Sequence, residues 1–154
     1  MTGRQGDVSL LEDPIAQELL RSRELARLAY SWTDGTPRVV PIWFHWTGQE
    51  LTFGSPAKAP KLKALQRDGR VAVTIDESSS WPYRALLLRG DTSVEMLDGV
   101  SEEYAAAAVR YFGEEQGRAW VSQLEDKPMA RISVTPTWVT VLDFQTRFPS
   151  ALSA

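Results

Sequence analysis

The chain of 154 residues carries 17 lysine and arginine residues against 20 aspartate and glutamate residues, a formal net charge of −3. This balance argues against a general binder of nucleic acid or of anionic membranes. The absence of cysteine excludes disulfides and thiolate chemistry, and a single histidine excludes a histidine-based metal cluster, so we expect no bound metal. The sequence shows neither a secretory signal nor an apolar run long enough to span a membrane, so we expect a cytoplasmic protein.

The start of the chain divides into a polar stretch and a helix. Residues 1–11 are polar and contain glycine, and we expect a flexible N-terminal arm ahead of a single domain over residues 12–154. Asp13 followed by Pro14 is typical of a helix start, because the carboxylate caps the first turn and proline fits the first helical position. A short amphipathic helix is therefore predicted after residue 13.

Six segments have the alternating or β-branched character of strands. They cover residues 25–32, 38–46, 51–55, 70–76, 85–97 and 129–144. Asp34 and Gly35, between the first two segments, are a strong signal for a tight turn. Gly90 and Pro136 predict a bend or bulge within the two longest segments.

Helices are predicted in the two longer gaps between these strands. The lysine-rich stretch after residue 55 indicates a short helix that ends near residue 67. Ser101 and the glutamates after it indicate the start of another helix, which ends at Gly113 and is followed by a further helix. Six strands with peripheral helices favour a mainly β fold with some α structure, a small antiparallel β-barrel.

The second strand segment has apolar side chains on both faces. One face holds Val40, Ile42, Phe44 and Trp46, and the other holds Val39, Pro41, Trp43 and His45. A domain of this size has one core, which can cover only one of these faces. We therefore expect a second subunit to cover the other face, which predicts a homodimer.

Three of the four lysines lie close together in residues 55–65. They are Lys58, Lys61 and Lys63, and Ser55 precedes them. Ammonium groups and a hydroxyl at the end of a strand suit a phosphate group. A solvated basic turn explains the same residues, and the residue types alone leave both interpretations open.

An ordered set of short motifs resembles a known family. It consists of Val40-Pro41-Ile42-Trp43-Phe44, the strand of residues 51–55, the segment of residues 61–65 and the turn of residues 67–71. The set is similar to the core of the FMN-binding split β-barrel superfamily, the pyridoxamine 5′-phosphate oxidase-like proteins. The similarity covers residues 25–95 best. It implies a six-stranded antiparallel Greek-key split β-barrel with peripheral helices.

The resemblance also implies where a cofactor lies. In such relatives the cofactor crosses the interface of a homodimer, with its ring against the valine-proline strand. Carried over to this chain, Val40, Pro41, Ile42 and Trp43 lie beside the ring. Gly54 and Ser55 fall near the ribityl chain or phosphate, and Lys61 falls on the phosphate. The family motif has an arginine where this chain has Pro60, so Lys58 is the candidate to replace that charge, and Lys63 is expected on the solvent side.

The function that this implies is hydride transfer between a bound cofactor and a small organic substrate. Trp81, Tyr83 and Arg84 are the candidates for the substrate side, together with Trp43. FMN is the family's default cofactor, and the deazaflavin coenzyme F420 is the alternative. Two other interpretations stay open: a non-catalytic protein that binds flavin for sequestration or sensing, and a structural dimer with an empty cleft.

Overall fold

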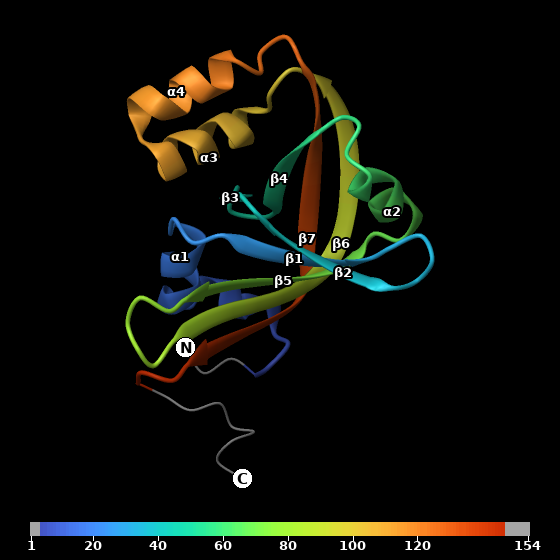
Figure 1. Cartoon of the computed structure of the whole chain (residues 1–154). Helices are drawn as coiled ribbons and strands as arrows, with labels where there is room; N and C mark the ends of the chain where they lie inside the picture. Colours follow the sequence, from blue (N-terminus) through green and yellow to red (C-terminus); the bar gives the residue numbers. More distant parts are fainter. Residues whose placement is uncertain (1–3, 147–154) are drawn as a thin grey trace.

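The structure is a computed structural model that describes residues 4–146. It is mainly β with peripheral helices (Figure 1). The strands are β1 (Ala26–Ser31), β2 (Pro37–Ile42), β3 (His45–Trp46), β4 (Leu51–Pro56), β5 (Arg70–Glu77), β6 (Arg84–Asp98) and β7 (Pro128–Asp143). The helices are the 3-10 helix η1 (Val8–Glu12), α1 (Pro14–Leu20), α2 (Lys61–Arg67), α3 (Glu102–Phe112) and α4 (Glu114–Ser122). None of the helices in this described part is long and apolar enough to cross a membrane.

The strands form one sheet in the order β2-β1-β5-β6-β7-β4-β3, and neighbouring strands in it are antiparallel. β5, β6 and β7 follow one another, and β4 returns beside β7, which is a Greek-key arrangement. β2 and β3 are the two outer strands of this order, yet only residues 43–44 separate them in the chain. The sheet must therefore curl until its two outer strands meet, as in a barrel.

The structure has seven strands where the sequence predicts six, because the predicted strand of residues 38–46 is divided. β2 pairs with β1, whereas β3 pairs with β4 at the opposite end of the sheet order. The chain leaves one ladder and enters the other at Trp43 and Phe44, and Phe44 is fully buried at that turn. The apolar run continues through the change of partner, so the sequence pattern does not reveal the break.

The predicted irregularity in the long strands is confirmed. The register between β6 and β7 shifts between Arg89 and Gly90, where Gly90 faces Pro136 and Arg89 faces Trp138. A Cβ atom on Gly90 would lie 2.3 Å from the carbonyl oxygen of Thr135. A side chain at position 90 would therefore force the two strands apart.

The predicted helix ends are also confirmed. An Oδ1 oxygen of Asp13 accepts a hydrogen bond from the backbone N–H of Ile15 at 2.9 Å, which caps α1. Ser101 caps α3 in the same way by accepting from the N–H of Tyr104 at 3.1 Å. Gly113 separates α3 from α4 with a φ of 89°, a conformation that L side chains rarely adopt.

The second half of the N-terminal segment, residues 8–11, packs on the barrel. Leu10 and Leu11 of η1 belong to the buried core together with Leu19 and Leu20 of α1. The predicted arm of residues 1–11 therefore contributes core side chains at its end, while residues 1–3 lie outside the described residues. Residues 147–154 of the predicted domain of residues 12–154 also lie outside the described residues. We propose that the described part from residue 12 onward forms one domain that carries this segment as an extension.

Candidate functional site

The lysine segment links the end of β4 to α2. Lys58 and Lys63 are exposed, whereas Lys61, the first residue of α2, is half-buried. Burial lowers the pKa of the Lys61 ammonium, because removal from water disfavours its charged form. None of the ion pairs found among the described residues involves Lys61. A half-buried cation without an ion-pair partner is suited to an anionic ligand such as a phosphate.

The two residues predicted beside that phosphate have opposite surroundings. Ser55 is buried in the β4–β7 ladder opposite Ala130, and its hydroxyl reaches only the carbonyl of Pro56 at 3.4 Å. Gly54 lies on the other face of β4, where the ring of Tyr104 covers it so closely that a Cβ atom would be 2.2 Å from Cδ2. Within this chain, Lys61 and the exposed Lys58 are the predicted phosphate contacts that are accessible.

The predicted ring-binding strand is an exposed edge. β2 pairs with β1 on one side and lies at the end of the sheet order. Val40 and Ile42 pack against the core, whereas Val39 is 64% exposed and Pro41 is also exposed. An edge strand offers unpaired backbone N–H and C=O groups, which can bind a flat heterocycle or another strand.

Trp43 lies just after β2 and packs against aromatic side chains of α3 and α4. Its ring stacks on Tyr111 with centroids 5.3 Å apart, and it meets Phe112 edge-on at 4.9 Å. Tyr104 and Trp120 complete the cluster at 5.8 and 6.3 Å. The ring predicted beside the cofactor is therefore half-buried by its own chain, and only its remaining exposed part can face a ligand.

Polar contacts that the sequence does not reveal hold α3 at this position. Arg110 donates to the carbonyl oxygens of Ser22 and Phe44, the first at 3.0 Å. The hydroxyl of Tyr111 donates to the carbonyl oxygen of Glu24 at 2.8 Å. These acceptors lie many residues away in the sequence, so no local motif could have indicated the pairs.

The only histidine lies beside this helix. The Nδ1 atom of His45 is buried and has no hydrogen-bond partner, and burial is the main cause that lowers the pKa of the imidazole. The positive charge of Arg110 lowers this pKa further, and Glu103 acts in the opposite direction. His45 is therefore a neutral side chain at physiological pH.

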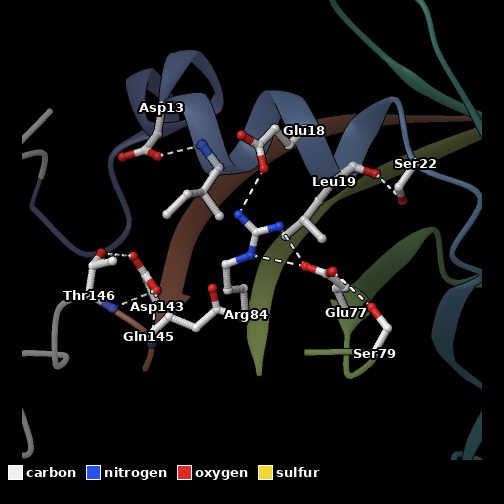
Figure 2. A network of polar contacts seen from close by, with 11 residues as sticks. Asp13, Glu18, Leu19, Ser22, Glu77, Ser79, Arg84, Asp143, Gln145 and Thr146 are labelled. Atoms are coloured by element: carbon white, nitrogen blue, oxygen red, sulfur yellow. Dashed lines mark hydrogen bonds and ion pairs between the residues drawn. The ribbon is translucent and has the colours of Figure 1, made fainter. Parts of the chain in front are cut away.

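The residues predicted on the substrate side lie in and after the loop between β5 and β6. Trp81 is 79% exposed, and its ring centroid is 5.7 Å from that of Tyr83. Arg84 donates to Oε2 of Glu77 at 2.5 and 3.0 Å and to Oε2 of Glu18 at 2.8 Å (Figure 2). The charge of Arg84 is therefore already compensated by two carboxylates.

A surface groove of about 590 Å³ lies beside α2. Its walls come from the turn after β1, from the lysine segment and α2, and from β6. They are formed by Trp32, Thr33, Ala57, Lys58, Ala59, Pro60, Leu62, Lys63, Gln66 and Met96. Lys63, expected on the solvent side, thus shares a groove with Lys58, whereas Lys61 does not line it.

A sequence model of the pyridoxamine 5′-phosphate oxidase family matches residues 13–143, nearly the whole described chain. The chain belongs to this family. No curated protein is similar enough in sequence to count as a relative.

Solved structures with the same fold have names that point to different ligands. One named F420 reductase is 27% identical, with a TM-score of 0.63, over 79% of this chain and 93% of that chain. A conserved hypothetical protein, Rv2991 from Mycobacterium tuberculosis, is 19% identical, with a TM-score of 0.68, over 94% and 91% of the two chains. The haem storage protein HutZ from Vibrio cholerae is 20% identical, with a TM-score of 0.60, over 84% and 93%. At 19% and 20% identity, the likeness shows a shared fold.

The predicted site residues of this family member fall into two separate groups. The turn between β1 and β2 meets the lysine segment, because Arg67 of α2 donates to the carbonyl oxygen of Thr33 at 2.7 Å. The loop that carries Trp81 and Tyr83 lies on the other side of the molecule from α2 (Figure 1). One chain therefore brings the turn that leads into the ring-binding strand beside the lysine segment, but it does not bring the predicted substrate residues there.

Proposed function

We propose that this protein is an oxidoreductase that binds a flavin-type cofactor at the interface of a homodimer, with coenzyme F420 as first candidate and FMN as second. The arrangement of β2 carries the proposal. This exposed edge strand leads from the turn that shares a groove with Lys58 and Lys63, so a flat ring on β2 could direct its phosphate end toward the lysine segment. The 27% identity to a structure named F420 reductase supports the order of the two candidates.

The cofactor would supply the hydride chemistry when it is bound, and the side chains of this protein would position it. Lys61 would bind the phosphate, and the backbone of Val40, Pro41 and Ile42 would face the ring. Trp43 closes the end of this strand by packing against α3. A second subunit would contribute the surfaces that one chain keeps apart, including Trp81 and Tyr83.

A side-by-side titration of the purified protein with F420 and with FMN, followed by fluorescence, tests this proposal. Saturable binding of one cofactor at micromolar or lower concentration is the expected result. Binding of neither would overturn the proposal and leave the lysine segment as a solvated basic turn.

A turnover experiment distinguishes an oxidoreductase from a protein that only sequesters its cofactor. Reduced cofactor is mixed with the protein and a panel of electrophilic organic substrates, and its reoxidation is followed by absorbance. We expect faster reoxidation with at least one substrate class than without protein. Tight binding without any acceleration would favour sequestration.

A further inference from the structure

The groove beside α2 carries positive charge that is not compensated within the described chain. Lys58 and Lys63 line it, and no aspartate or glutamate is among the described residues of its walls. The ion pairs found among residues 4–146 include neither of the two lysines. Their cations are Arg27, Arg70, Arg84, Arg118 and Arg131. Two unpaired cations in one groove are conspicuous on a protein with a net charge of −3.

Two arginines add to this charge at the rim. The guanidinium of Arg38 lies 4.8 Å from the ring centroid of Trp32, and Arg67 donates to the carbonyl oxygen of Thr33. Asp34 is an acidic group nearby; hydrogen bonds from Thr36 are the main cause that lowers its pKa, and the charge of Arg38 adds a minor contribution. The rim is therefore cationic on the sides of β2 and of α2.

We propose that this groove binds an extended chain of carboxylates, the oligoglutamate tail of coenzyme F420. The inference rests on the proposed function and makes it more specific. Ala57, Lys58 and Pro60 form one wall of the groove and precede Lys61 directly. A tail that leaves a phosphate at Lys61 would thus enter the groove without crossing another part of the surface. FMN ends at its phosphate and has nothing to place there.

The other arginines that could serve an anionic tail are engaged elsewhere. Arg84 and Arg131 are held by carboxylates, and Arg89 lies 4.1 Å from the ring centroid of Trp138. Arg38 is the one that lies at the groove. The apolar walls suit the methylene groups of a glutamate chain, while the lysines at the edge suit its carboxylates.

The experiment compares two forms of F420, one with several glutamates and one without any, by fluorescence titration at low salt. For the native protein we expect tighter binding of the long-tailed form. The double variant Lys58→Gln/Lys63→Gln should lose about three- to tenfold in affinity for that form, the range expected for two exposed charge contacts. Lys58 is also a predicted phosphate contact, so the affinity for the glutamate-free form should fall by less, and the single variant Lys63→Gln should leave that affinity unchanged.

Matched variants separate a local effect from a change in net charge. Arg21→Gln/Lys127→Gln removes two exposed cations outside the groove and should leave both affinities unchanged. Gln66→Glu adds a carboxylate to the groove wall and should weaken the binding of the long-tailed form only. High salt should remove the preference for the long tail, because exposed charge contacts are screened.

The outcomes distinguish this inference from the function on which it rests. Equal affinity of the native protein for both forms of F420 would overturn the groove assignment while the proposed function stands. The groove assignment would also fail if the lysine double variant kept the full preference for the long tail. If neither F420 nor FMN binds, the proposed function fails, and the groove assignment fails with it.

Discussion

Lys61 is partly buried, whereas the other two lysines of its segment are exposed. Burial lowers the pKa of its ammonium group, so the charged form is less favourable in the folded protein than in the unfolded chain. At pH values below its folded-state pKa, the charged ammonium therefore lowers the free energy of unfolding. This destabilisation disappears as the pH rises through that pKa. A cation kept at such a position is expected to have a ligand.

Lys61→Met should consequently affect stability and binding in opposite directions. We expect a higher unfolding temperature for the protein without cofactor, because a desolvated charge is removed. Affinity for F420 and FMN should fall by about 1.5–3 kcal/mol, the contribution of a charge-assisted hydrogen bond. Thermal unfolding and fluorescence titration measure the two effects, with Lys127→Met as the control. A variant that loses stability and keeps its affinity would show that Lys61 is structural.

Gly54 is kept small by the ring of Tyr104, which occupies the space of a Cβ atom. Trp120 donates to the hydroxyl of Tyr104 at 3.0 Å, so the ring is held at both ends. We expect Gly54→Ala to destabilise the protein by about 1–3 kcal/mol, the usual range for overpacking. Chemical denaturation measures this loss. In a Tyr104→Ser background the same change should have little effect, and an equal loss in both backgrounds would contradict the contact.

At this scale the sequence identifies residue types better than their surroundings. The three clustered lysines indicate an anionic site, but α2 has to be in place before it is clear that Lys63 faces the same groove as Lys58. Ser55 has the right chemistry for a phosphate, yet the β4–β7 ladder buries it. Which face of a strand a side chain occupies depends on pairing, and a short strand's pattern gives this only in part.

The helix α3 packs on β3 and β4, and α4 packs on α3 (Figure 1). Glu103 of α3 accepts from Arg131 of β7 at 2.7 and 2.9 Å, and both side chains are mostly buried. The hydrogen bonds from Arg131 are the main cause that holds the pKa of Glu103 below its usual value. A lowered folded-state pKa means that this pair stabilises the protein above the ordinary glutamate pKa.

The attachment of α3 should therefore weaken in acid. As the pH falls from the ordinary glutamate pKa of 4.5 through the lowered value, Glu103 takes up a proton and its contribution to stability is lost. Hydrogen exchange of the α3 amides at decreasing pH should show earlier opening than that of β6. In the Glu103→Gln variant, we expect the α3 amides to exchange faster at neutral pH. Their exchange should also depend less on acid than in the native protein. An unchanged profile in that variant would assign the acid effect to other carboxylates.

The limits of secondary-structure prediction are clearest at β2 and β3. Helix caps at Asp13 and Ser101 and the bulge at Gly90 are local signals, and the structure confirms them. The interruption after Ile42 is not local, since it depends on which ladder each half of the apolar run joins. The contacts of Arg110 depend on tertiary packing in the same way.

At the scale of the whole molecule, the first three strands of the sheet order carry a row of exposed small apolar side chains. Across β2, β1 and β5, Val39 lies opposite Ala29, and Ala29 lies opposite Ala72. Val39 and Ala72 are exposed, and Ala29 is half-buried. Small and β-branched residues on an exposed sheet surface suit close packing against a second sheet. We propose that this face is the subunit interface.

Val39→Asp tests that interface, because it places a carboxylate at the β2 end of the apolar row, where the exposed valine lies. A charge buried between two subunits without a partner strongly disfavours association. We expect the native protein to sediment as a dimer and the variant as a monomer with an unchanged far-UV circular dichroism spectrum. Val8→Asp, at a half-exposed valine on η1, is the matched control and should remain a dimer. Because the proposed cofactor site requires both subunits, Val39→Asp should also abolish cofactor binding. A monomeric native protein, or a Val39→Asp dimer with full affinity, would assign this face another role.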